Sequence, residues 1–173
     1  MKLTKNILLL VAGLAMAACT DAGRFGADGS SAGGAGGAGS GAIVPGSAND
    51  PTSTAYFNQT VGDRVLFAVD QSTVTDEGRV TLDGQAEWML LNTDFTAVIE
   101  GHADEQGTRE YNVALGARRA NAVREYLISR GVAGNRLTTV SYGKERPIEI
   151  CSNEACYAKN RRAVTVLAGG LSS

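Results

Sequence analysis

The chain has 173 residues, of which 43% are hydrophobic and 20% are charged, and its formal net charge at pH 7 is −2. The apolar fraction is sufficient for one folded domain of ordinary size. The mildly acidic balance gives no reason to expect a nucleic acid as a partner, because proteins that bind nucleic acids concentrate basic residues on one surface.

Residues 1–18 have the pattern of a lipoprotein signal peptide. A basic start is followed by an apolar run from Ile7 to Ala18 that is too short for a comfortable membrane span. Small residues precede Cys19, the position at which a lipoprotein signal is removed and the cysteine receives lipid; a free cysteine after a plain secretory signal is the alternative. Thr20, where an aspartate would favour the inner membrane, favours the outer membrane. We therefore expect a lipid anchor on Cys19 in the outer membrane, with the rest of the chain facing the periplasm.

Residues 19–60 are expected to form the lipidated cysteine and a disordered tether. Gly, Ala and Ser dominate from Ala22 to Ala48, so this stretch has little to bury. About 40 such residues have a root-mean-square reach of roughly 35 Å. The tether would let a folded domain act at a distance from the membrane, although a passive linker has the same composition.

One folded domain is expected over residues 61–168, followed by a short tail, 169–173. Apolar periodicity and turn residues predict strands and helices in the order β-α-β-α-β-β. The resulting fold class is α+β, with two main helices packed on a small mixed four-stranded sheet. The expected strands are Val61–Val69, Thr96–Glu100, Leu137–Tyr142 and Ala163–Leu167, and the helices are Arg79–Asn92 and Asn112–Arg130.

The second helix directs an arginine toward the core. At about 100° per residue, Arg119 lies roughly 40° from Leu115 and inside the apolar stripe. A buried guanidinium keeps its charge, so it needs a partner or contact with water. Asp104 follows the strand that precedes this helix, so the two side chains are expected to meet in a shallow pocket. They form either a structural ion pair or a clamp for a zwitterion, in which the arginine binds a carboxylate and the aspartate an ammonium group.

Two cysteines lie in the loop before the last strand. Cys151 and Cys156 are expected to form a local disulfide, since export places them in an oxidising compartment. Such a small ring stabilises a fold by about 2 kcal/mol. A metal site is the alternative, but two cysteines and one histidine are too few ligands, so neither a metal nor a cofactor is expected.

Several motifs in fixed order resemble a known family. They are Gly101–Thr108, Glu110–Asn112, Leu115–Gly116, Arg118–Val123, Val140–Glu145 and Lys159–Val164. Together, over about residues 61–168, they resemble the OmpA-like C-terminal domain family, and within it the peptidoglycan-associated lipoproteins. The resemblance implies a βαβαββ sandwich that is not an enzyme and binds the diaminopimelate stem peptide of peptidoglycan. It also implies TolB and TolA-like partners, in a Tol-Pal type system that supports envelope integrity and cell division.

The resemblance also implies roles for individual residues. An aspartate at the position of Asp104 receives the ammonium group, and an arginine at the position of Arg119 receives the carboxylate. The further binding positions implied by the family are Asp70, Phe67, Asn112, Leu115, Arg161 and Arg162.

Two other functions are possible on the residues alone. A hydrolase could use His102, Asp104 and Glu105 for acid–base chemistry, but no serine or cysteine nucleophile is matched to a base. The wall-binding domain of another OmpA-like lipoprotein, or of a flagellar-motor stator, would share the fold. A stator, however, carries a true transmembrane helix in place of a short signal that ends in Cys19.

Overall fold

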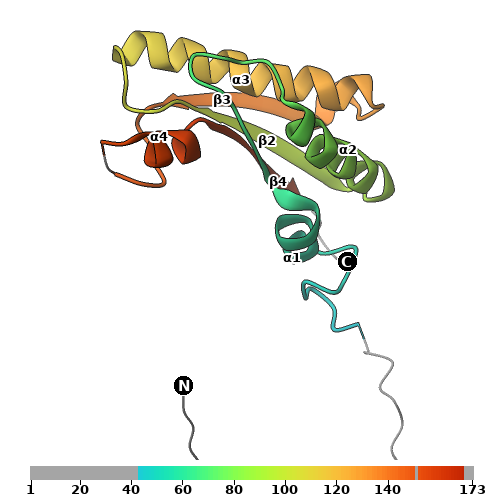
Figure 1. Ribbon diagram of the computed structural model, residues 1–173. Coiled ribbons are helices and arrows are strands. Elements are labelled where there is room, and N and C mark those ends of the chain that lie inside the picture. Colours follow the sequence, from blue (N-terminus) through green and yellow to red (C-terminus); the bar gives the residue numbers. More distant parts are fainter. Residues whose placement is uncertain (1–42, 151, 170–173) are drawn as a thin grey trace, which may run out of the picture. The chain divides into compact units, whose positions relative to one another are not determined.

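The computed structural model describes residues 43–150 and 152–169 of the chain (Figure 1). The signal peptide, the lipidation site Cys19, most of the tether, Cys151 and nearly all of the tail lie outside the described residues. The predictions made for them stay predictions.

A four-stranded mixed sheet forms the centre of the domain, with strand order β1-β4-β2-β3. β2 and β3 run parallel, whereas β4 runs antiparallel to both β1 and β2. Val98 of β2 pairs with Thr138 of β3 on one side and with Val166 of β4 on the other. The strands are β1 (Arg64–Leu66), β2 (Phe95–His102), β3 (Leu137–Gly143) and β4 (Arg162–Gly169). This arrangement confirms the predicted fold class.

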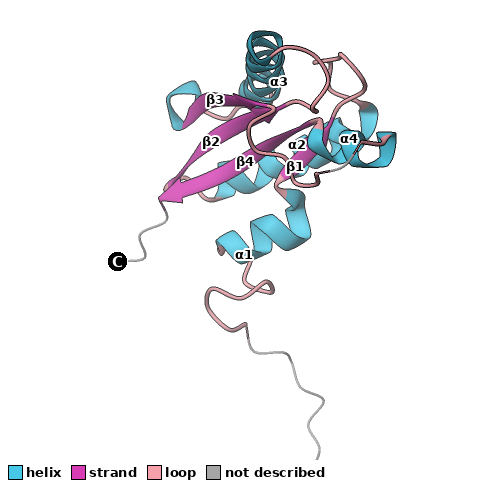
Figure 2. Cartoon of the chain, turned by 90° about the vertical axis from the view of Figure 1, so that its left-hand side faces the viewer, coloured by secondary structure: helices cyan, strands magenta, loops and turns pink. Residues whose placement is uncertain are grey.

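Two long helices, α2 (Asp76–Leu91) and α3 (Arg109–Ser129), pack with the sheet (Figures 1 and 2). Each begins at a threonine whose hydroxyl accepts a backbone N–H bond: Thr75 from Gly78 N at 3.0 Å and Thr108 from Tyr111 N at 3.2 Å. Such caps satisfy donors that a helix start leaves unpaired. No helix in the described ranges is long and apolar enough to cross a membrane.

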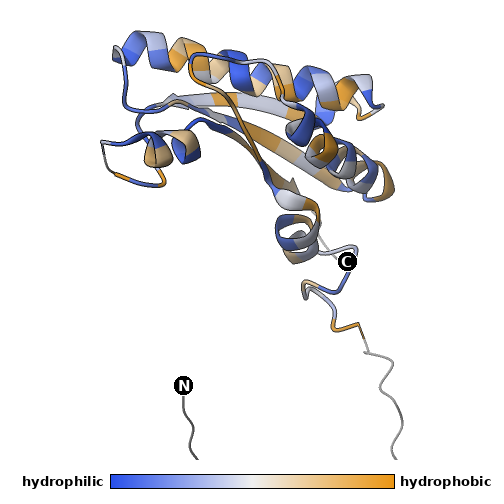
Figure 3. Cartoon of the chain, in the orientation of Figure 1, coloured by the Kyte–Doolittle hydropathy of each residue, from blue (hydrophilic) through white to orange (hydrophobic). Residues whose placement is uncertain are grey.

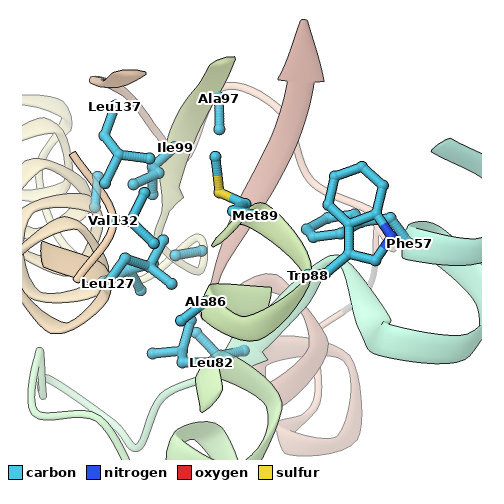
Figure 4. Close-up of a cluster of buried hydrophobic side chains, with 14 of the residues drawn as sticks. Phe57, Leu82, Ala86, Trp88, Met89, Ala97, Ile99, Leu127, Val132 and Leu137 are labelled. Carbon is cyan, nitrogen blue, oxygen red and sulfur yellow. The ribbon is translucent and has the colours of Figure 1, made fainter. Parts of the chain in front are cut away.

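The hydrophobic core lies between these helices and the sheet (Figure 4). Along β2 the buried side chains alternate with more exposed ones, so Ala97 and Ile99 point to the same side. They meet Met89 of α2 and Leu127 of α3, all at most 1% exposed. Figure 3 shows polar and apolar residues alternating along α3, as expected for a helix with one buried face.

Helix α3 lies unusually close to the sheet because two glycines face each other. A Cβ atom on Gly101 of β2 would come within 1.8 Å of the carbonyl oxygen of Gly116 in α3. A Cβ atom on Gly116 would lie 2.4 Å from Ser141 Oγ in β3. Only glycine fits at this crossing, and the close approach brings the next turn of α3 under the end of β2.

The folded domain begins before residue 61, so the tether expected to extend to residue 60 is too long. Helix α1 (Thr54–Tyr56) continues into a π-helical turn, Phe57–Gly62. Phe57 is fully buried with its ring centroid 5.0 Å from that of Trp88. The Trp88 indole N–H donates to Pro51 O at 2.7 Å. Two adjacent aromatic residues, Tyr56 and Phe57, in an otherwise polar stretch carry no helical or strand periodicity, which is why the sequence did not predict this segment.

The predicted first strand is also too long, since only Arg64–Leu66 pair with β4. Gly62 before it and Asp70 after it have positive φ angles of 93° and 56°, so the chain turns on both sides of the strand. A short helix, α4 (Glu154–Asn160), occupies the loop expected before β4. Its Cys156 is 1% exposed and disulfide-bonded. The other two cysteines lie outside the described residues, so the pairing with Cys151 remains a prediction.

Candidate ligand-binding site

A cavity of about 260 Å³ lies where the loop after β1, the loop between β2 and α3, and the first turns of α3 come together. It unites four of the predicted site residues with four that sequence reasoning did not assign to the site. The predicted ones are Asp70, Asp104, Asn112 and Leu115, and the added ones are Val69, Gln106, Gly107 and Tyr111. Gln106, Gly107 and Tyr111 lie within the family motifs, and this was the sequence feature that could have identified them as cavity residues.

Asp104 is 7% exposed and already has a cationic partner. Its Oδ2 accepts from Arg161 Nη1 at 3.1 Å, and its Oδ1 accepts from the backbone N–H of Gln106 at 3.2 Å. Arg161 also donates to Glu154 of α4. Burial opposes the charge on Arg161, but the bonds to Glu154 and Asp104 raise its pKa. The Asp104 carboxylate therefore reaches the cavity as part of a fixed chain of two carboxylates and one guanidinium, whose formal charges sum to −1.

Arg119 is fully buried, as its helical phase predicted, but it does not lie on the cavity wall. Its Nε donates to Gln71 O at 2.8 Å, and its Nη1 donates to His102 O at 2.8 Å. Its Nη2 donates to Ala68 O at 3.2 Å. One side chain thus ties the loop after β1 to the end of β2.

The positive charge of Arg119 interacts with the acidic residues of the cavity, although the hydrogen-bond partners of Arg119 are carbonyl groups. Burial lowers its pKa to about 10, so it remains a cation at neutral pH, and the negative charges of Asp104 and Asp70 act in the opposite direction. The guanidinium lies 5.3 Å from the ring centroid of Phe67. Among the ion pairs of residues 43–150 and 152–169, none joins Asp104 to Arg119. The expectation that these two side chains meet in one pocket is therefore wrong, and so is the alternative of a direct structural pair between them.

Asp70 is the exposed carboxylate of the cavity. It has a left-handed backbone conformation with φ of 56°, which aspartate tolerates better than most residues. The Tyr111 hydroxyl donates to its Oδ1 across the cavity. The hydrogen bond to Asp70 is the main reason why the pKa of Tyr111 is raised. No cationic side chain in the described part of the chain forms an ion pair with Asp70.

Asn112 and the adjoining loop shape the floor of the cavity. Asn112 is 1% exposed, and its amide donates to Gln106 O at 2.8 Å. The Lys144 ammonium group donates to Gly107 O at 2.7 Å. Leu115, one turn further along α3, is 5% exposed and supplies apolar surface. These contacts hold the loop between β2 and α3 in one shape.

Besides Arg119, three other predicted site residues do not line this cavity. Phe67 is buried beneath Arg119, and Arg161 reaches the cavity only through Asp104. Arg162, the first residue of β4, is not among the residues that line the cavity. It donates to the carbonyl oxygens of Asn160 and Arg146 at 3.3 Å and 3.1 Å. Burial and then the nearby charge of Arg64 lower its pKa.

His102 is 2% exposed and is not a cavity residue. Burial, together with the positive charges of Arg162 and Arg146, lowers its pKa to about 4, so its ring is neutral at pH 7. Neither ring nitrogen has a hydrogen-bond partner among the described residues. Within the same ranges no group of three or more His, Cys, Asp or Glu residues could hold a metal ion. Glu100 Oε2 lies 3.7 Å from His102 Nε2, but no ion pair in the described ranges joins His102 to Asp104 or Glu105, the two acids of the hydrolase alternative.

Known proteins share both the sequence and the fold. The model of the OmpA family matches residues 66–161. The chain is 47% identical over 163 residues to a peptidoglycan-associated lipoprotein of Rhizobium meliloti (strain 1021), covering 94% of this chain and 87% of that protein. It is also 47% identical over 169 residues to one from Mesorhizobium japonicum, covering 96% and 95% of the two chains.

Solved structures agree with this relationship. The crystal structure of the peptidoglycan-associated lipoprotein from Burkholderia pseudomallei superposes with a TM-score of 0.62 at 38% identity, over 69% of this chain and 98% of that chain. The C-terminal domain of Helicobacter pylori MotB shares the fold, with a TM-score of 0.59 at 22% identity over 63% and 86% of the two chains. The chain belongs to the peptidoglycan-associated lipoprotein family, and its folded part is an OmpA-family domain.

Proposed function

We propose that the cavity binds the diaminopimelate residue of the peptidoglycan stem peptide. The observation that carries this proposal is the placement of opposite charges, with Asp70 and Asp104 on the cavity wall and the Arg119 guanidinium buried behind it. The free end of diaminopimelate bears an ammonium group and a carboxylate. It therefore matches a site in which acidic groups and a fixed cation lie within electrostatic reach of one another.

The two aspartates have different parts in this proposal. Asp70 is exposed and has no cationic partner among the described residues, so it offers the ammonium group a direct ion pair. Asp104 adds negative potential, but much of its charge is balanced by Arg161. The ligand carboxylate lies toward Arg119, whose carbonyl partners keep the cation in place.

The chain is not an enzyme, because its family consists of structural wall-binding domains. In the proposed function it is an anchor. Lipid on Cys19 holds one end in the outer membrane, the Gly/Ala/Ser tether crosses the intervening space, and the domain binds the wall from the periplasm. The match to lipoproteins along 94% of the chain supports this reading of the N-terminal region. Mass spectrometry of the mature protein should find a triacylated Cys19 at its N-terminus, and an intact residue 1 would contradict the anchor.

Wall binding can be tested by pull-down on purified peptidoglycan. Asp70→Asn and Asp104→Asn should each lower retention at least about tenfold, because each removes a negative charge from the cavity wall. Asp94→Asn is the matched control, since Asp94 is an exposed aspartate outside the cavity and should bind as the unchanged protein does. Full retention of both site variants would show that the ligand binds elsewhere.

We further propose that TolB and TolA-like proteins are partners, within a system that supports envelope integrity and cell division. The surface over Asp104–Asn112 is our candidate for TolB contact, because it presents the exposed part of the site loop. A competition titration with a diaminopimelate-containing peptide should then displace TolB. If the peptide and TolB bind at the same time, each to saturation, then the two binding surfaces are distinct and the proposed overlap is wrong.

A further inference from the structure

The hydrogen bond between Tyr111 and Asp70 crosses the cavity and joins two distant segments of the chain. Tyr111 lies in the first turn of α3, and Asp70 lies in the loop after β1. Both side chains belong to the cavity wall, and both residues are exposed, Tyr111 to 44%. The bond is therefore made at the mouth of the site, where a ligand enters.

Among the described residues, Tyr111 is the hydrogen-bond partner of the exposed Asp70 carboxylate. The left-handed backbone conformation of Asp70 is one that aspartate tolerates, and the neighbouring Val69 is 53% exposed and gives the side chain little packing support. A free exposed carboxylate samples several rotamers. A carboxylate has two oxygens, and Tyr111 occupies only one of them, so the other remains available to a ligand donor.

Tyr111 is itself held from two sides. Its backbone N–H donates to the Thr108 hydroxyl that caps α3, at 3.2 Å. The Arg118 guanidinium lies over its ring, 5.8 Å from the centroid. Because the helix start and the ring are both fixed, the hydroxyl is presented to Asp70 in one direction.

We propose that Tyr111 is a positioning residue for ligand binding, whose hydroxyl holds the Asp70 carboxylate at the cavity mouth so that its second oxygen receives the ammonium group of the ligand. This inference rests on the proposed function of the cavity. It adds a residue that acts through Asp70, with no need for a direct bond between Tyr111 and the ligand.

A double-mutant cycle on the full chain tests the proposal, with a purified diaminopimelate-containing stem tripeptide as the probe in a calorimetric titration. Tyr111→Phe should weaken binding about threefold to tenfold, because it removes one hydrogen bond that positions a charged group. In an Asp70→Asn background the same substitution should have no further effect, since the residue it positions has lost its charge. Tyr126→Phe is the matched control, because the Tyr126 hydroxyl donates to Asp83 at 2.8 Å away from the cavity. That variant should keep the affinity of the unchanged protein.

A second probe tests the group that Asp70 receives. The same tripeptide acetylated on the side-chain amine of diaminopimelate should bind weakly, and equally weakly to the Tyr111→Phe variant. If Tyr111→Phe binds the free tripeptide as tightly as the unchanged protein does, while Asp70→Asn weakens it, the positioning role is wrong and the proposed function stands. Equal losses from Tyr111→Phe in both backgrounds would also overturn the positioning role. Failure of the unchanged protein to bind the free tripeptide would overturn both.

Discussion

Arg119 stabilises the fold through its hydrogen bonds, in addition to supplying a buried positive charge. Its three donated bonds, to Gln71, His102 and Ala68, satisfy backbone carbonyls that no other described side chain reaches. Arg119→Ala should therefore destabilise the fold by about 3 kcal/mol or more, because it removes three hydrogen bonds, one of them to the buried carbonyl of His102, and leaves a cavity behind. Urea denaturation would measure this. Arg118→Ala, which removes the exposed neighbouring arginine, should change the free energy of unfolding by less than about 1 kcal/mol. Equal, small effects of the two substitutions would contradict the structural role of Arg119.

His102 should make stability depend on pH in the mildly acidic range. Its pKa is about 4 in the folded state and about 6.5 in the unfolded chain. Because the folded pKa is depressed, the unfolded state binds the proton first, so stability falls as the pH drops from about 6.5 toward 4. The loss amounts to at most about 3 kcal/mol. A series of chemical denaturation curves would detect it, and His102→Gln should flatten the slope between pH 6.5 and 5. An unchanged slope in that variant would assign the dependence to other groups.

At the scale of elements, the contact between α3 and β2 depends on two glycines. Gly101→Ala would place a methyl group 1.8 Å from a backbone oxygen, and backbone cannot move aside as a flexible side chain can. The expected cost exceeds about 3 kcal/mol, with α3 displaced from the sheet. Gly84→Ala in α2 is the control, since its Cβ would meet Val61 Cγ1 at an ordinary 3.4 Å, and alanine favours a helix. Thermal unfolding of the two variants should therefore shift in opposite directions, and a stable Gly101→Ala protein would contradict the packing.

The elements with strong periodicity were predictable from sequence, and those set by distant contacts were not. The 3.6-residue pattern of α3 placed Arg119 in the core, and the strand before it placed Asp104 at the cavity. Periodicity could not reveal that the partner of Asp104 would be Arg161, 57 residues away. The family resemblance supplied Asp70 as a binding position, and the motif contained Tyr111 without giving it a role, whereas Val69 became a site residue only once the loop after β1 was folded against α3. Phe57 was missed for the same reason, since only Trp88 explains why it is buried.

At the scale of the whole molecule, the proposed function assigns wall binding to the folded domain and membrane attachment to the N-terminal region. The described domain holds the cavity and the core, and in the proposed function the lipid expected on Cys19 binds the membrane. A Gly/Ala/Ser segment of the length between them has a root-mean-square reach of some tens of ångströms. In the proposed function, a tether of that reach lets one chain engage a membrane and a wall at the same time.

The claim that the cavity recognises a zwitterionic wall peptide is tested most directly by a nuclear magnetic resonance titration. The protein is labelled with ¹⁵N and titrated with a diaminopimelate-containing stem tripeptide, then with the same peptide carrying lysine in place of diaminopimelate. The account predicts saturable shifts of the amide signals of Asp70, Asp104 and Gln106 with the first peptide. It predicts much weaker shifts with the second, because lysine keeps the ammonium group but lacks the carboxylate. Shifts confined to another surface, or equal affinity for the two peptides, would contradict it.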